Sequence, residues 1–204
     1  MPSMSAVPGF LPSTHGLHFP NTFDPGPTVR FGPIDPRWIG IGDAKAGLCG
    51  GMAWYVRERF EAGLPIPPDQ MAPANGTPLF QALVRRQVQS LEWMRTPLAF
   101  WWMGAHGPDG AARRTRETEC PKIAATIGSG HLAMVGLIRH QGLNPFKLTE
   151  SHQVLAYASD TQSETTTFRI YDPNHHNLDD ITISADATGI HQSTHETLYG
   201  FFQL

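Results

Sequence analysis

A cysteine, a histidine and an aspartate follow one another in this chain, each in a setting that suits nucleophilic catalysis. Cys49 lies in the segment AGLCGGMAW, residues 46–54, where a glycine-rich turn leads into an amphipathic helix. The N-terminus of a helix stabilises a thiolate. His152 and Asp172 lie far downstream, on two segments with the pattern of strands. These residues predict a thiol hydrolase in which Cys49 attacks, His152 transfers protons and Asp172 orients the imidazole.

The two strands are predicted to form a hairpin that brings His152 and Asp172 together. The polar residues 160–164 separate the strands and are of the size of a hairpin turn. If Ser159 faces Thr165 across this turn, His152 lies directly opposite Asp172, with their Cβ atoms about 5 Å apart. Because side chains alternate between the faces of a sheet, a slip of one residue would separate the pair.

The elements that must position these residues change in character along the chain. Residues 1–40 are rich in proline and glycine and predict an irregular arm. Apolar spacing and helix-ending residues then predict helices over about 49–62, 78–94, 98–103 and 121–127, with an interruption at Pro97 and a turn at 107–110. Strands are predicted over about 132–138, 150–159, 165–172, 179–184 and 197–203. Helices followed by strands indicate an α+β domain, with helices on one side of an antiparallel sheet.

Length, charge and cysteine content exclude several classes of protein. The 204 residues suit one domain, with an arm (1–40), a helical lobe (41–130) and a β lobe (131–204). The net charge of −3 and the absence of a basic stripe argue against nucleic acid, and no apolar run approaches a membrane span. The first 13 residues lack the features of a secretory signal, and two cysteines do not form a disulfide framework. We therefore expect a cytoplasmic protein whose partner is a peptide or protein substrate.

This arrangement of residues resembles the papain-like cysteine peptidase superfamily, in particular the bacterial branch similar to double-glycine leader peptidases. The resemblance covers about residues 41–175 and consists of a cysteine at the start of a helix and a late hairpin that carries His152 and Asp172. It implies a papain-like fold, with Cys49 as the nucleophile, His152 as general base and acid, and Asp172 as the orienting residue. No cofactor and no metal are expected.

Two positions depart from the family pattern. Papain-like enzymes usually carry a glutamine about six residues before the cysteine, which donates to the oxyanion, and here that position is Asp43. We expect Asp43 to line the site, either kept protonated by burial, paired with Lys45, or bound to a cationic group of the substrate. Lys45 or a backbone N–H would then supply the second oxyanion donor. Gly50 also replaces the aromatic residue that often follows the cysteine.

Other assignments compete with this one. Cys49 also fits an ordinary position on the apolar face of its helix. Asn174 is a second candidate for the orienting role, and Cys120, next to Pro121, is expected to be structural. His175-His176 and the pair His191 and His195 are candidate metal ligands, but the chain has no H-E-x-x-H motif and no paired cysteines.

Three functions share these residues. The first is hydrolysis of a peptide or amide bond through an acyl-enzyme. The second is thiol acyl transfer or deamidation, as in a transglutaminase or a toxin effector, which differs in whether water or an amine resolves the acyl-enzyme. The third is a catalytically inactive binding module on a papain-like scaffold, which Asp43 favours slightly.

Overall fold

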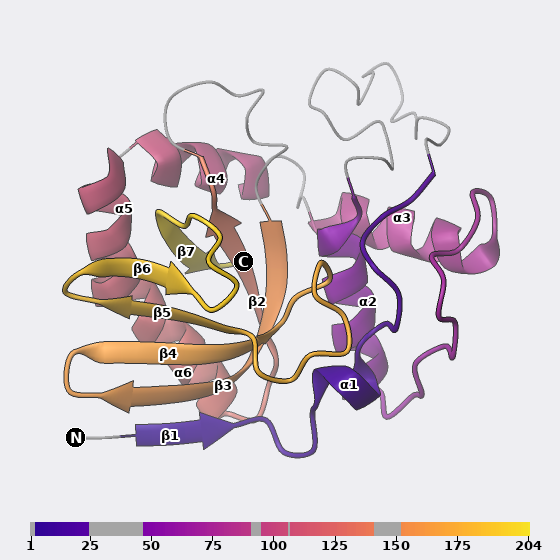
Figure 1. The fold of residues 1–204 in the computed structure, drawn as a ribbon, viewed down its shortest axis with the longest axis horizontal. Helices are drawn as coiled ribbons and strands as arrows, with labels where there is room; N and C mark the ends of the chain where they lie inside the picture. Colours follow the sequence, from indigo (N-terminus) through magenta and orange to yellow (C-terminus); the bar gives the residue numbers. More distant parts are fainter. Residues whose placement is uncertain (1–2, 25–46, 91–94, 106, 141–151) are drawn as a thin grey trace.

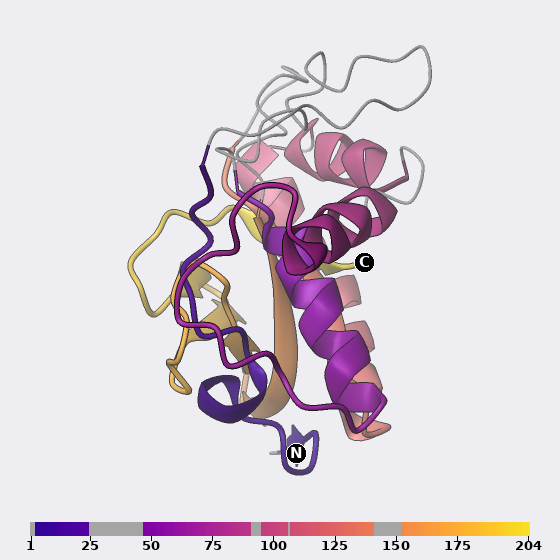
Figure 2. The ribbon, with the colours of Figure 1, turned by 90° about the vertical axis from the view of Figure 1, so that its right-hand side faces the viewer.

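The computed structural model describes residues 3–24, 47–90, 95–105, 107–140 and 152–204. It has an α+β architecture in which a curled antiparallel sheet carries helices on one face, as Figures 1 and 2 show. The strands of the described residues are β1 (Ser3–Ala6), β2 (Ala133–Ile138), β3 (His152–Gln162), β4 (Thr165–Tyr171), β5 (Thr182–Asp186), β6 (Gly189–Gln192) and β7 (Gly200–Gln203). Their order in the sheet is β6-β5-β4-β3-β2-β7, and β1 also pairs with β3.

The helices precede most of the sheet in the chain. They are α1 (Pro12–His15), α2 (Cys49–Glu61), α3 (Pro78–Ser90), α4 (Arg95–Ala105), α5 (Gly107–Arg114) and α6 (Cys120–Gly128), with a π-helical turn (Thr115–Glu119) between the last two. The helix α2 packs between α3 and the central strand β3. Among the helices of the described residues, none is both long and apolar enough to cross a lipid bilayer.

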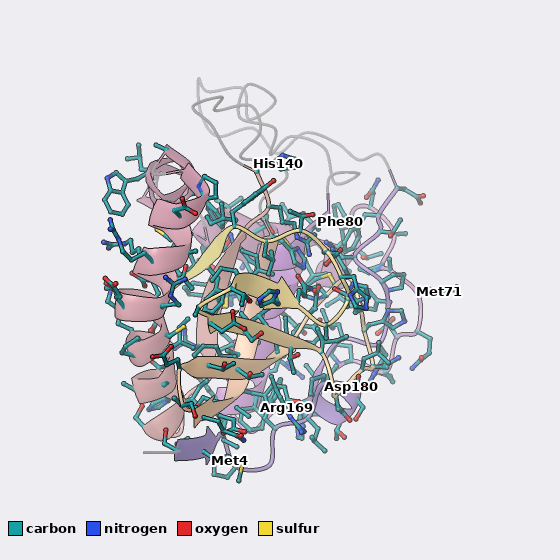
Figure 3. The ribbon with its side chains drawn as sticks, turned by 60° about the vertical axis from the view of Figure 1, so that its left-hand side comes forward. Met4, Met71, Phe80, His140, Arg169 and Asp180 are labelled. Carbon is teal, nitrogen blue, oxygen red and sulfur yellow. The ribbon has the colours of Figure 1, made fainter. Side chains whose placement is uncertain are left out.

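The core fills the space between the helices and the sheet. Its members have almost no exposed surface, and the largest include Tyr171, Phe168, Phe201, Met52 and Leu83. Residues 154–156 of β3 are completely buried, since β3 lies between β2 and β4 and packs against α2 and α6. In Figure 3, Met4 and Met71 lie at the periphery, in keeping with their exposed fractions of 84% and 80%.

Several predicted helix boundaries are wrong, for reasons of local chemistry. Residues 107–110 are not a turn but the start of α5, because Gly107 takes a left-handed φ of 69° and Pro108 suits the first helical turn. Pro97 does not interrupt a helix, since it lies in the first turn of α4, where its missing N–H has no helical acceptor. The helix α6 begins one residue early, at Cys120. The last residues of the predicted helix 78–94, from 91 onward, lie outside the described residues.

The predicted strands are found, with changed limits and two additions. The predicted strand 179–184 becomes β5, and 197–203 shortens to β7. The strand β1 within the predicted irregular arm, and the strand β6, were not predicted. Both are only four residues long, too short for an alternating pattern to stand out.

Candidate active site

Cys49 is the first residue of α2, as its sequence predicts. The backbone N–H of Leu48, just before it, donates to the side-chain Oδ1 of Asn21 at 2.6 Å, and the N–H of Gly51 donates to Oε1 of Gln87 at 2.8 Å. Side-chain amides thus satisfy N–H groups of the first turn that have no acceptor within the helix. Cys49 is half-buried, whereas Cys120 is buried.

The two glycines after Cys49 allow α2 to approach its neighbours closely. A Cβ on Gly50 would lie 2.5 Å from both Gln153 Oε1 and Ser90 Oγ. A Cβ on Gly51 would lie 2.2 Å from the backbone oxygen of Leu83 in α3. The absence of the aromatic residue that often follows the cysteine therefore has a steric reason, because the helix start is packed against α3 and β3.

His152 and Asp172 form a buried hydrogen-bonded pair. The distance from His152 Nε2 to Asp172 Oδ1 is 2.6 Å, and the exposed fractions of the two residues are 3% and 1%. Asp172 Oδ1 also accepts from the backbone N–H of Asn174 at 2.9 Å, and Oδ2 accepts from Gln192 Nε2 at 3.2 Å. These donors fix the carboxylate in the orientation that holds the imidazole.

The predicted register of the hairpin is wrong, although the contact that it was meant to explain is present. Thr165 pairs with Gln162 rather than Ser159, so the turn has two residues, Ser163 and Glu164. Ser163 takes a positive φ of 55°, as tight hairpin turns require. Further along, Leu155 pairs with Tyr171, which places Asp172 level with Val154. His152 therefore reaches Asp172 diagonally, two residues along the same face.

A break in the register makes this diagonal contact possible. The pairing shifts by one residue between Ala156 and Ala158, where Tyr157 is the extra residue of a β-bulge. Without this shift Asp172 would lie level with Leu155, whose side chain points to the opposite face from His152. The bulge thus places Asp172 on the same face of the sheet as His152, as the predicted register had assumed.

The charges of the site favour a thiolate beside an imidazolium. Burial opposes ionisation of the Cys49 thiol, but the neighbouring His152 imidazole, with help from the N–H groups of Gln153 and Gly50, brings its pKa below the ordinary 9.0. Burial would lower the pKa of His152, but the Asp172 carboxylate and then the Cys49 sulfur raise it to about 10. Although burial works against the charged carboxylate, His152 lowers the pKa of Asp172 to about 2. His152 and Asp172 are therefore charged near neutral pH, and the lowered pKa of Cys49 favours its thiolate form.

A second group of polar side chains lies beyond Asp172. Asp172, His175 and Glu196 offer ligand atoms that all lie within 4.8 Å of one another, a spacing that a metal ion could use. Glu196 is already bonded to Arg139 Nη2 at 2.6 Å, and this guanidinium also helps to lower the pKa of Asp172. A cation at this place would face the charge of Arg139 and compete with His152 for the carboxylate, so the residues do not fit a metal centre.

The other predicted site residues have varied outcomes. Asn174 does not hold the imidazole. Its backbone donates to Asp172, and its side chain accepts from Asn21 Nδ2 at 3.0 Å. Cys120 is buried in α6, and burial and then Glu119 raise its thiol pKa to about 12. Asp43 and Lys45 lie outside the described residues. His191 lies on β6 and contacts Asp186, so it has a local partner.

Sequence reasoning missed three amide side chains around the site: Asn21, Gln153 and Gln192. Gln192 and Gln153 are only 5% and 4% exposed, but a single glutamine in a strand gives no local signal of its burial. Asn21 had a visible clue, because it continues the alternate-residue series Leu17, Phe19 and Phe23, whose other members are buried.

No family model, curated protein or solved structure matches this chain. What the site can do is therefore inferred from its own geometry.

Proposed function

We propose that this protein is a cysteine-dependent hydrolase that cleaves a peptide or amide bond with a Cys49–His152–Asp172 triad, in the manner of papain-like enzymes. The observation that carries the proposal is the buried His152–Asp172 hydrogen bond beside the first residue of α2, together with the opposed pKa shifts of Cys49 and His152. A buried structural cysteine has the reverse shift, as Cys120 does.

The chemistry follows from the charges. The Cys49 thiolate attacks the carbonyl carbon, and the His152 imidazolium gives its proton to the departing amine, which leaves a thioester. Water then attacks the thioester, His152 takes its proton, and the acid and the thiol are released. The backbone N–H of Cys49, at the helix start, has no acceptor four residues earlier in the helix and supports the oxyanion.

The first test compares the two cysteines of one chain. At neutral pH, iodoacetamide should alkylate Cys49 much faster than Cys120, with the sites assigned by mass spectrometry of the digested protein. Cys120 is buried and its pKa is about 12, so it serves as the internal control. Equal, slow alkylation of both cysteines would overturn the assignment of Cys49 and favour a binding module.

The second test decides the reaction. A peptide library is incubated with the wild-type protein and with Cys49→Ala, in the presence and absence of a primary amine. Hydrolysis predicts new peptide termini that the variant does not produce. Products that carry the amine, or deamidated side chains without cleavage, would instead identify an acyltransferase or a deamidase.

A further inference from the structure

A segment near the N-terminus contacts both the turn before Cys49 and the turn after Asp172. This crossing segment, residues 16–24, follows α1 and runs beside α2, as Figures 1 and 2 show. Its apolar side chains at alternate positions, Leu17, Phe19 and Phe23, are buried, and Phe23 packs edge-on against Phe80 of α3 with ring centroids 6.0 Å apart. Figure 3 marks Phe80 on that helix. The segment is thus anchored in the core by residues other than Asn21.

Asn21 is the polar member of the same alternating series, and its contacts join two separate turns. Its side-chain Oδ1 accepts from the N–H of Leu48 at 2.6 Å, and its Nδ2 donates to Asn174 Oδ1 at 3.0 Å. Its backbone N–H donates to the oxygen of Pro173 at 3.2 Å. A Cβ on Gly47, whose φ is 88°, would lie 2.6 Å from Nδ2, so the turn before the helix is shaped around this amide.

The two turns that Asn21 joins are those that carry the reacting groups. Leu48 directly precedes Cys49, and the backbone of Asn174 holds Asp172 Oδ1, which in turn holds His152. A single planar amide therefore spans from the nucleophile to the residue that orients the base. Since a carboxamide offers one acceptor and a pair of donors at fixed spacing, it sets both turns at once.

We propose that Asn21 is a positioning residue, which fixes Cys49 relative to the His152–Asp172 pair. The inference rests on the proposed function, because it assigns Asn21 a part in the same triad. An error of about 1 Å in the placement of reacting groups can cost about a hundredfold in rate. Asn21 touches none of the reacting atoms, so its effect is transmitted through Leu48 and Asn174.

The structure supplies a matched control on the same segment. His18 Nδ1 lies 2.7 Å from Asn177 Oδ1, which ties the crossing segment to the loop that follows β4. The variant His18→Ala removes one side-chain tie of this segment and Asn21→Ala removes two, but only Asn21 bonds to Leu48 and Asn174. Ser13, bonded to Asp179 at 2.8 Å and 2.6 Å, helps to keep the segment docked in both.

The experiment measures alkylation of Cys49 by iodoacetamide across pH, together with the melting temperature. We expect Asn21→Ala to slow alkylation at pH 7 by about ten- to a hundredfold and to move the midpoint of its pH profile upward, toward that of an ordinary thiol. His18→Ala should match the wild type in both readouts. Asn174→Ala, which keeps the backbone bond to Asp172, should slow alkylation less, because the bond to Leu48 remains.

A double-mutant cycle tests the link itself. If the Asn21–Asn174 bond carries part of the effect, the double variant loses less than the product of the two single losses. Fast alkylation of the wild type with an unchanged rate in Asn21→Ala would overturn this inference and leave the proposed function standing. The same is true of equal losses in Asn21→Ala and His18→Ala. Slow alkylation of wild-type Cys49 would instead overturn the proposed function, and the positioning role with it.

Discussion

The substitution Asp172→Asn removes one charge from the site and keeps its shape. In the wild type, Asp172 is the chief reason that the pKa of His152 stands at about 10 despite burial. Without that carboxylate, burial favours the neutral imidazole, and the Cys49 thiolate loses its counter-ion. The thiol then returns at least to its ordinary pKa of 9.0. At pH 7 such a thiol is ionised in about one molecule in a hundred.

We therefore expect Asp172→Asn to slow alkylation of Cys49 at pH 7 by up to about a hundredfold. The wild-type and variant rates should converge above pH 10, where both thiols are ionised. The measurement is the second-order rate of iodoacetamide labelling from pH 5 to 11, resolved by site so that Cys120 reports on unfolding. A wild-type rate at pH 7 in the variant would refute the role of Asp172.

The structure suggests that this variant folds. Gln192 now donates to Asp172 Oδ2, while its own Oε1 is buried and has no partner among the described residues. If its amide turns over, Oε1 accepts from the new amide and Nε2 takes the place that Oε1 now occupies without a partner, so the number of unpaired buried groups does not rise. Asp186→Asn is the control, because that carboxylate, held by Thr188, also has a pKa of about 2 but lies in the exposed β5–β6 turn. It should leave alkylation unchanged.

Three further predictions concern the pH dependence of stability, the packing of α2 on α3, and Asp43, six residues before Cys49. Because the pKa of His152 is raised from 6.5 to about 10 and that of Asp172 is lowered from 3.8 to about 2, the pair stabilises the fold most between about pH 4 and 6.5. In urea titrations, the difference in unfolding free energy between the wild type and Asp172→Asn should shrink as pH rises toward 10 and as it falls toward 2, and a pH-independent difference would contradict this. Gly51→Ala should lower the free energy of unfolding by about 1–3 kcal/mol, because its Cβ meets the backbone oxygen of Leu83, whereas Gly128→Ala, with its nearest neighbour at 3.9 Å, should be tolerated. If both variants melt alike, the close packing of α2 on α3 is not a constraint. Asp43→Asn and Asp43→Gln should keep or raise turnover of a Cys49-dependent substrate and alter its pH profile, since an amide donates to an oxyanion at every pH. A rate and a pH profile that both match the wild type would exclude Asp43 from the chemistry.

The start of α2 and the identity of the buried pair were predictable from local signals. A glycine-rich turn before apolar residues at helical spacing gives a helix that begins at Cys49, and the structure confirms it. Two strand patterns with a polar turn between them predicted the hairpin of His152 and Asp172, and β3 and β4 do pair in the structure. These features depend on residues close in sequence, where periodicity and turn chemistry act directly.

The amides around the site were not predictable in this way. Gln192 reaches Asp172 only because β6 and the turn after β4 lie near each other in the folded sheet. Asn21 reaches Leu48 across 27 residues of chain. Such contacts are decided by the packing of distant elements, and a single glutamine or asparagine has the same local preferences whether it is buried or exposed.

The hairpin shows how a wrong register can still give the right pair. Pairing in the outer part of the hairpin is set by the turn, and a two-residue turn moves β4 by three positions from the predicted alignment. An odd displacement would put Asp172 on the face opposite to His152, because side chains alternate. The bulge at Tyr157 takes back one of these positions, which leaves an even net displacement of two and returns Asp172 to the face of His152. Tyr157 is held in place by its hydroxyl, which donates to the oxygen of Asp179 at 2.6 Å, and by its ring, which packs on Phe10. The geometry of the site therefore depends on a residue that takes no part in its chemistry, and a bulge beside a functional pair serves to re-aim a side chain.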